Sequence, residues 1–410
     1  MKSRLFIIFL ILFMDVLGFG LILPLLPYYA HTYGASAWIT GLLVATYALM
    51  QFIGAPILGR WSDQRGRRPI LLISIFGTAL GFALMGAAEW IGWTLFGKGT
   101  MLAGITILAL LFLSRFLDGL TGGNFSVAQA YITDVTDDEN RAKGLGMIGA
   151  AFGMGFIFGP ATGGFLSKFG FAAPAWAAFA VSVLNWGLVY AYLPESLSEE
   201  RRAEMRAHPR PPLRLNLLWT TLQHPKVGPL FITRFAFGLA FGLFQSIFSL
   251  YAAGAPLHLS AEQNGYVLSY VGILSAIMQG AVVARLAKRF PEQRLAFIGA
   301  GVTILGFIGW AFTLNVPMIL GVITLFAIGV SLLGMMLSTI LTKSVDPHEM
   351  GQTLGMGASY DSLTRIIAPT LGGWLLSQFG ASAPGFAGAI IMILTFGYMK
   401  KTFPLVQPKA

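Results

Sequence analysis

The chain alternates long apolar segments with short polar connections. An α-helix needs about 20 mostly apolar residues to cross the hydrocarbon core of a bilayer, and twelve segments meet this requirement. We place them at roughly 5–29, 39–59, 70–91, 101–133, 142–168, 172–193, 228–254, 262–287, 294–314, 316–342, 352–379 and 382–402. This pattern predicts an all-α integral membrane protein with twelve transmembrane helices.

One long polar connection divides these segments into six and six. Residues 194–227 contain several prolines and charges of both signs, which we interpret as a flexible cytoplasmic linker. We therefore predict an N-terminal six-helix bundle over 1–193 and a C-terminal six-helix bundle over 228–410.

The two halves carry similar sequences. LGM at 145–147 recurs at 354–356, and GPATGG at 159–164 recurs as APTLGG at 368–373, with one shared offset of 209 residues. Repeated halves related by a pseudo-axis are typical of transporters, whose substrate site lies between the halves near the bilayer midplane. The sequence therefore predicts two pseudo-symmetric bundles.

The charged residues support this topology. The chain is 56% hydrophobic and 11% charged, whereas a soluble domain carries about 25% charged residues. Basic residues gather in the connections on one side of the predicted membrane, and only Lys98 and Lys168 lie on the other side. The positive-inside rule then places both termini in the cytoplasm. Topology thus explains the net charge of +10, and we expect no nucleic-acid partner.

The charged connection RWSDQRGRRP at 60–69 has a specific spacing of glycine, acid and arginine. We expect Gly59 to let its helix approach a neighbour closely and Gly66 to allow a tight turn. Asp63 is placed to cap a helix N-terminus, and the planar fork of Arg67 can pair with two carboxylates. The pattern resembles the signature loop between helices 2 and 3 of the major facilitator superfamily, with the residues Gly59, Asp63, Gly66, Arg67 and Arg68.

The resemblance implies that this loop acts as a conformational latch. In the superfamily the aspartate meets helix 11, and the arginine bridges to an acid at the end of helix 4, a position that Asp134 fills here. Such pairs would hold the two halves together on the cytoplasmic side in the outward-open state. The alternative is that these charges only enforce the topology.

A second signature, on helix 5, is dense in glycine. Each glycine costs a helix roughly 1 kcal/mol against alanine in water, but it permits close packing and bending. The Gly-Pro-x-x-Gly-Gly order resembles the antiporter motif of drug:proton exchangers, and the alternative is generic small-residue packing. The motif residues are Gly149, Gly153, Gly155, Gly159, Pro160, Gly163 and Gly164.

Two further stretches resemble tetracycline:proton antiporters and their multidrug relatives. They are DVLGFGLILPLLP at 15–27 and RFLDGLTG at 115–122. The tetracycline antiporters have an acid on helix 3, a histidine on helix 8 and an acid on helix 9. This sequence has Gly81 and Ser275 at the first two positions and no ionisable residue within 295–342. The sequence therefore argues against tetracycline–magnesium as the specific substrate and against a metal ion as cargo.

Few ionisable groups lie inside the predicted spans. Because a charge in lipid is costly, each such group is a functional candidate by default. Asp15 has no partner within its own helix, and Asp361 has no acidic counterpart in the first half, where Phe152 holds the equivalent position. We assign proton coupling to Asp15, Arg115, Asp118, Asp361 and Arg365.

The spacing of these groups also predicts ion pairs. Arg115 and Asp118 stand at i, i+3, and Asp361 and Arg365 at i, i+4, so each pair can meet on one helix face; a purely structural role is the alternative. We expect Arg234, a turn or two into its helix, to snorkel to the cytoplasmic surface. An acid that loses its arginine partner in one conformation gains a proton there, and we take Asp15 as the leading proton carrier.

Polar and aromatic side chains within the helices are candidates for the lining of a substrate cavity. The alternative for each is a packing role between helices. The candidates are Tyr28, Asn124, Gln245, Tyr251, Gln279 and Tyr360.

Together these features predict a secondary active transporter that performs proton-coupled efflux, by antiport, of lipophilic drugs, cationic ones included. The alternative is a proton-coupled carrier of a physiological metabolite such as a sugar or an organic anion. The sequence lacks a Ser/His/Asp cluster, a metal-spaced histidine pair, a phosphate loop and any cysteine, so we expect no enzyme activity.

A secondary active transporter of this kind also has expected partners. We expect no cofactor and no metal, with a proton gradient as the energy source. The partners would be a small-molecule substrate, protons and the lipid bilayer. We expect a monomer with several spans in the inner (plasma) membrane of a bacterium.

Overall fold

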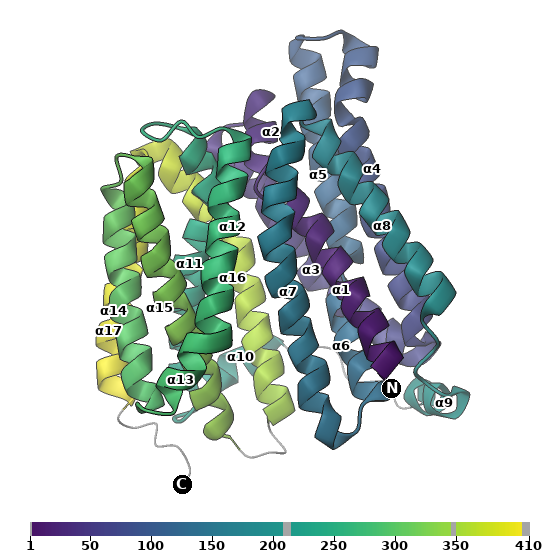
Figure 1. Ribbon diagram of the computed structural model, residues 1–410, viewed down its shortest axis with the longest axis vertical. Coiled ribbons are helices and arrows are strands. Elements are labelled where there is room, and N and C mark those ends of the chain that lie inside the picture. Colours follow the sequence, from purple (N-terminus) through teal and green to yellow (C-terminus); the bar gives the residue numbers. More distant parts are fainter. Residues whose placement is uncertain (1, 208–214, 346–349, 404–410) are drawn as a thin grey trace. The chain divides into compact units, whose positions relative to one another are not determined.

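The computed structural model describes residues 2–207, 215–345 and 350–403, and every regular element in these ranges is a helix (Figure 1). The first half contains α1 (Lys2–Ile22), α2 (Leu26–Thr32), α3 (Ala37–Arg65), α4 (Arg67–Phe96), α5 (Met101–Thr121), α6 (Asn124–Val135), α7 (Asp138–Leu166), the short η1 (Ser167–Phe169) and α8 (Ala172–Tyr192). The second half contains α11 (Gly228–Ala253), α12 (Ala261–Ile277), the π-helical η2 (Met278–Val282), α13 (Val283–Ala287), α14 (Glu292–Ala311), α15 (Val316–Lys343), α16 (Met350–Phe379) and α17 (Ala383–Thr402).

The predicted membrane class is confirmed. Eleven helical segments of the described chain are long and apolar enough to span a bilayer. The twelfth predicted span is α16, whose 30 residues are also long enough. Three predicted spans contain a local break: α1 and α2 are separated at Pro24, α5 and α6 at Gly122–Gly123, and α12 and α13 by η2.

The connection between the halves is more ordered than the predicted flexible linker. Within 194–227, residues Glu199–Ala207 form α9 and Leu215–Leu222 form α10, while 208–214 lie outside the described residues. The sequence of α9, EERRAEMRA, begins with two glutamates and has Arg206 in its last turn. This charge order favours a helix because it complements the helix dipole.

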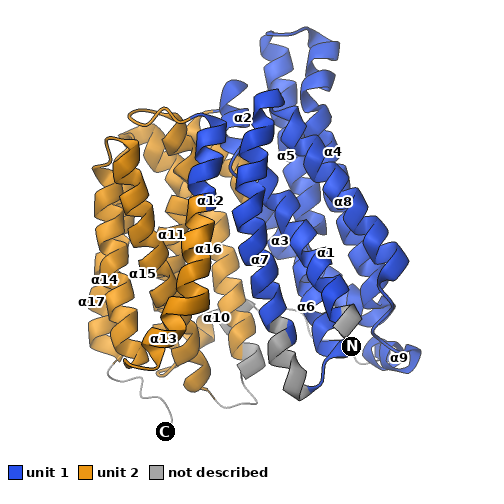
Figure 2. Ribbon diagram, viewed as in Figure 1, with its two compact units in different colours: residues 1–35, 46–213, 260–269 blue, residues 36–45, 214–259, 270–410 orange. Residues whose placement is uncertain are grey.

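The described residues form two compact units (Figure 2), and each unit repeats the same packing scheme. In unit 1, α1 packs against α7 and α8, and α4 packs against α5 and α8. In unit 2, α11 packs against α16 and α17, and α14 packs against α15 and α17. Each of these contacts in unit 2 joins the two spans that come six spans after the contacting pair in unit 1. This is the internal repeat that the sequence predicted.

The units depart from the predicted halves at two short segments. Residues 36–45 belong to unit 2, and residues 260–269 belong to unit 1. Glycine accounts for both groupings because it lets backbones approach closely. Within unit 2, Gly41 packs on the backbone of Pro369, and within unit 1, Gly265 packs on Gly164.

Three glycines of the helix 5 signature form the face of α7 that packs against α1. A Cβ atom added at Gly155 would lie 2.5 Å from Val16, and one at Gly159 would lie 2.7 Å from the Cα atom of Gly20. Gly163 meets the backbone of Leu21 in the same way. These residues recur every fourth position, so they stack along one helix face and let the two backbones nearly touch.

Not every glycine of the signature serves this packing. Gly149 and Gly153 have no described atom within 4 Å of the position that a Cβ atom would take. The motif therefore combines a packing face with positions that the α1–α7 contact does not require.

We expect Gly159→Ala to destabilise the protein by about 1–3 kcal/mol, because the new methyl group overpacks the α1–α7 contact. Gly149→Ala is the matched control and should leave stability unchanged or raise it by about 0.5–1 kcal/mol. Thermal unfolding of the two purified variants in detergent measures the difference. Equal midpoints would mean that α1 and α7 do not need this close approach.

Candidate functional site

The sequence signature at 59–68 folds into a tight turn between α3 and α4. Gly66 is the only residue between the two helices, and its φ of 108° is a value that side-chain-bearing residues rarely adopt. A Cβ atom at Gly66 would also collide with the carboxylate of Glu195. Both the backbone angle and the lack of space therefore require glycine here.

Glu195 caps the N-terminus of α4, whereas the sequence predicted Asp63 as a helix cap; Asp63 instead pairs with the side chain of Arg67. Its Oε1 accepts the N–H of Arg67 at 2.8 Å, and its Oε2 accepts the N–H of Arg68 at 3.1 Å. Oε1 also accepts the N–H of Ser196 at 2.9 Å. The N–H groups of Arg67 and Arg68 have no partner within the helix, and an anion at a helix N-terminus is favoured by the helix dipole. Glu195 is 128 residues away in sequence, so no local signal revealed the contact.

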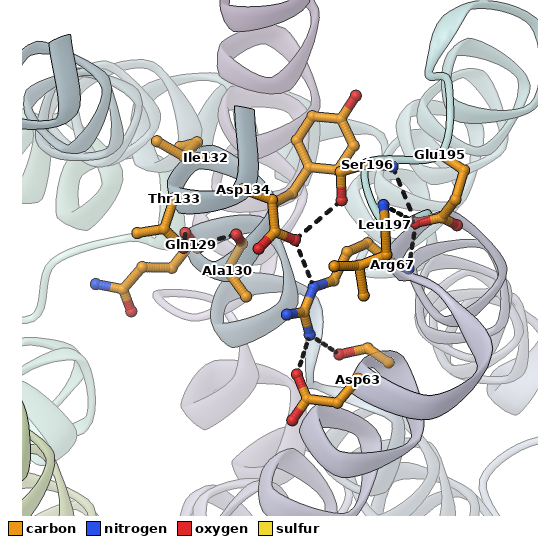
Figure 3. Close-up of polar contacts among 12 residues, drawn as sticks. Asp63, Arg67, Gln129, Ala130, Ile132, Thr133, Asp134, Glu195, Ser196 and Leu197 are labelled. Carbon is orange, nitrogen blue, oxygen red and sulfur yellow. Dashed lines mark hydrogen bonds and ion pairs between the residues drawn. The ribbon is translucent and has the colours of Figure 1, made fainter. Parts of the chain in front are cut away.

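Arg67 connects three helices through buried polar contacts (Figure 3). Its Nη1 lies 2.6 Å from Oδ1 of Asp63 and 2.7 Å from Oγ of Ser62, and its Nε donates to Oδ2 of Asp134 at 2.9 Å. Ser196 donates a further hydrogen bond to Asp134 at 3.0 Å. The arginine side chain is 3% exposed, so the two carboxylates neutralise a charge that water does not reach.

The remaining latch residues behave differently. Arg68 donates to the carbonyl of Tyr190 at 2.6 Å. The close helix approach predicted at Gly59 is wrong for the described residues, since no described atom lies within 4 Å of its Cβ position. Asp63, Arg67 and Asp134 all belong to unit 1, and the contact of the aspartate with helix 11 stays a prediction.

The second half contains an ion pair at the corresponding place, with the charges reversed. Glu292 begins α14, Lys343 ends α15, and their side chains form an ion pair. In unit 1 the arginine begins α4 and the acid, Asp134, lies near the end of α6. The second-half pair is 25% and 50% exposed and is therefore weaker, because water screens surface pairs.

A small polar cavity lies within unit 1 and contains two of the predicted proton-coupling acids. Its volume is about 30 Å³, which is room for about one water molecule. Its lining is Asp15, Phe19, Tyr47, Gln51, Thr78, Phe82, Asp118, Gly122, Asn124 and Phe125.

Asp15 is held in this cavity by an amide rather than by a cation. The Nδ2 of Asn124 donates to Oδ1 of Asp15, and the hydroxyl of Ser74 lies within hydrogen-bond distance of Oδ1 of Asn124. Asn124 is the first residue of α6 and follows the break at Gly122–Gly123. Asp15 forms no ion pair in the described part of the chain, so its negative charge is not compensated by a nearby arginine or lysine.

Asp118 has the cation that Asp15 lacks. The Nη1 of Arg115 lies 3.1 Å from Oδ2 of Asp118, as the i, i+3 spacing predicted. Both residues are buried, and the guanidinium also lies 5.5 Å from the centre of the Phe82 ring. Nε of Arg115 has no hydrogen-bond partner among the described residues. When both acids are ionised, Asp15, Asp118 and Arg115 leave one net negative charge.

A larger cavity lies within unit 2, with a volume of about 270 Å³. This is close to the lower end of the range for small-molecule sites, about 300 Å³. Helices α11, α15 and α16 line it with Arg234, Phe237, Gly238, Phe241, Gly242, Gln245, Gly334, Leu337, Asp361, Thr364 and Arg365.

The predicted pairing of Asp361 with Arg365 is wrong, and so is the predicted snorkelling of Arg234. Arg234 donates from Nε to Oδ1 of Asp361 at 2.9 Å and from Nη2 to Oδ2 at 2.6 Å. Its Nη1 donates to Ser338 at 3.2 Å. The guanidinium of Arg234, on the facing helix α11, can bind both oxygens of the carboxylate at once. Asp361 therefore pairs with Arg234 and not with Arg365, its neighbour one turn along α16.

The six predicted cavity residues separate into three groups. Asn124 lines the first cavity and Gln245 the second. Tyr251 and Tyr360 are buried beside aromatic rings, Tyr251 against Trp310 and Tyr360 against Phe231. The other two, Tyr28 and Gln279, line neither cavity.

A family model described as "Major Facilitator Superfamily" matches residues 8–369. The chain belongs to this superfamily. It is 32% identical over 384 residues to solute carrier family 22 member 18 of Rattus norvegicus, covering 93% of this chain and 90% of the relative. It is 33% identical over 393 residues to the class C tetracycline resistance protein of Escherichia coli, covering 92% and 89%.

A solved structure shows the same fold. The crystal structure of a D-xylose-proton symporter superposes with a TM-score of 0.72 at 18% identity, covering 99% of this chain and all of the other. Family and fold therefore point to a membrane transporter of the major facilitator superfamily and not to an enzyme.

We expect Glu195→Ala to destabilise this superfamily member by about 0.5–2 kcal/mol, because the cap of α4 is lost. Glu199→Ala is the control: its carboxylate is 77% exposed and lies 3.5 Å from Arg202, and such surface pairs contribute at most about 1 kcal/mol. Thermal unfolding in detergent compares the two. A shift in Glu199→Ala as large as that in Glu195→Ala would contradict the capping role.

Proposed function

We propose that this superfamily member is a proton-coupled antiporter that exports lipophilic compounds across the plasma membrane of a bacterium. The observation that carries the proposal is the small cavity of unit 1. There Asp15 contacts an amide while Asp118 contacts a buried arginine. Two acids with unequal partners in one cavity provide a site where a proton can be taken up and later released.

The chemistry follows from the cost of charge within a membrane. An unpaired carboxylate inside a span costs about 2.5–3.5 kcal/mol on insertion scales, and protonation of Asp15 removes that cost. If Arg115 moves from Asp118 towards Asp15, the carboxylate gains a cation and releases its proton. The break at Gly122–Gly123 separates α5, which carries Arg115, from α6, which carries Asn124, so it is suited to such a movement.

In the transport cycle, Asp15 would take up a proton from outside when substrate leaves. It would release that proton to the cytoplasm when the carrier faces inward and binds the next substrate. The proton gradient is then the sole energy source, with no cofactor, and one chain is sufficient. The contacts of Arg67 would control the switch between the two states.

Export of drugs is supported by the relatives. The similarity to the class C tetracycline resistance protein spans most of both chains. Tetracycline–magnesium itself is a poor candidate, because Gly81 and Ser275 hold two of the positions where the resemblance implies an acid and a histidine. We therefore propose other lipophilic compounds as substrates.

Proteoliposomes with a trapped pH dye and an imposed proton gradient test this function. We expect lipophilic drugs to trigger proton movement in the wild type and Asp15→Asn to abolish it, since an amide cannot carry the proton. Glu204→Gln, on the exposed side of α9, is the control and should behave as the wild type. Undiminished proton exchange in Asp15→Asn, Asp118→Asn and Asp361→Asn would rule out coupling by embedded acids.

A second candidate function is transport of an organic anion of metabolism. It is favoured by the cavity of unit 2, where Arg234, Asp361 and Arg365 leave one net positive charge. In the same assay such a carrier would respond to organic acids and stay silent towards neutral and cationic drugs.

A further inference from the structure

We propose that the unit 2 cavity is a binding site for an organic anion with an apolar body, in which Arg365 binds the acidic group. The inference rests on the proposed transport function and names the class of its substrate. Four observations support the proposal. They are the unpaired charge of Arg365, the position of this residue in the middle of α16, the apolar lining of the cavity and the uncharged residues at the corresponding positions of the first half.

The positive charge of Arg365 is uncompensated because Asp361, the acid one turn away, is already paired with Arg234. Both of its carboxylate oxygens accept hydrogen bonds from Arg234, which neutralises one arginine. Arg365 also lines the cavity, and it has no ion-pair or hydrogen-bond partner in the described ranges. An anionic ligand would supply the missing negative charge, and the guanidinium fork binds carboxylates and similar groups through two hydrogen bonds.

The position of Arg365 prevents it from reaching water at a membrane surface. It is the sixteenth of the 30 residues of α16, so it lies about 22 Å along the axis from either end. A side chain near a helix end can snorkel to the interface, but one at mid-helix cannot. The residue is exposed where it lines the cavity, so its charge is accessible to a ligand there.

The rest of the lining suits an apolar body. The rings of Phe237 and Phe241 are stacked with their centres 6.3 Å apart, and Leu337 adds an aliphatic surface from α15. The exposed Gln245 is one of the few polar groups besides the charged residues. Apolar walls with a few fixed polar groups are typical of ligand sites.

The first half has uncharged residues at the corresponding positions. At the shared offset of 209 residues, Asp361 and Arg365 correspond to Phe152 and Phe156 of α7. Those two rings stack on each other with centres 6.2 Å apart. A helix in the same place of the repeat thus packs without a charge at either position, so the packing of α16 does not require Arg365, and its charge is available to a ligand.

Three fluorescent probes that share one aromatic group separate the substrate classes: anionic dansylglycine, neutral dansylglycinamide and cationic dansylcadaverine. Equilibrium binding to the purified full chain in detergent is followed by dansyl fluorescence. We expect the wild type to prefer the anion. Arg365→Gln should weaken anion binding by about tenfold or more, the usual effect of losing a charged hydrogen bond, and leave the other two probes unchanged.

Two variants keep the experiment decisive. Arg365→Lys retains the charge without the fork and should bind the anion with intermediate affinity. Arg206→Gln removes an exposed arginine from α9 and should bind as the wild type does. Should Arg365→Gln fail to fold, a preference for the anion in Arg365→Lys supports the site and its absence overturns it. A wild type that prefers dansylcadaverine, or an equal loss of all three probes in Arg365→Gln, also overturns it.

The binding result and the transport result are independent. Anion binding that depends on Arg365, together with no substrate-triggered proton movement in proteoliposomes, would refute antiport and support the site. Proton movement triggered by dansylcadaverine alone would support antiport and refute the anion site. Proton movement triggered by dansylglycine and lost in Arg365→Gln would support both.

Discussion

The cost of an unpaired charge within a membrane governs the polar structure of this protein. Water cannot solvate groups in the hydrocarbon core, so an embedded charge persists only with a partner or with a task. Arg115 and Arg234 meet this constraint through carboxylates within hydrogen-bond distance. Asp15 has an amide partner, Asn124, but no cation, and Arg365 has no ion-pair or hydrogen-bond partner among the described residues. The Arg234–Asp361 pair joins two helices, whereas Asp15 and Arg365 are the groups for which we propose transport chemistry.

The same constraint gives the two cavities different characters. The unit 1 cavity holds one excess negative charge and has room for about one water molecule, which suits a proton. The unit 2 cavity holds one excess positive charge and a volume of about 270 Å³, which suits an anionic group with an apolar body. A duplicated bundle has thus kept its packing while the two copies took on different charges. In the antiport that we propose, these two sites would be occupied in different states of one cycle.

Helix packing relies on a second consequence of the lipid environment. Lipid tails are as apolar as leucine side chains, so helices associate through close van der Waals contact rather than through the hydrophobic effect. Glycine supplies that contact in both units. Gly155 and Gly159 bring α7 onto α1, and Gly238 and Gly242 bring α16 onto α11. Because α11 carries Arg234 and α16 carries Asp361, the glycine face between them also sets the distance over which this ion pair forms.

The sequence by itself predicted the spans, the repeat and the family, because hydropathy, spacing and signature residues are local properties. It also predicted the Arg115–Asp118 pair, whose members share one helix face. Only the tertiary structure decided which distant groups meet: Asn124 with Asp15, Glu195 with the start of α4, and Arg234 with Asp361. Partners on different helices are chosen by how those helices are turned and packed, and no spacing along the chain records that choice. The charge left on Arg365 follows from the last of these pairings.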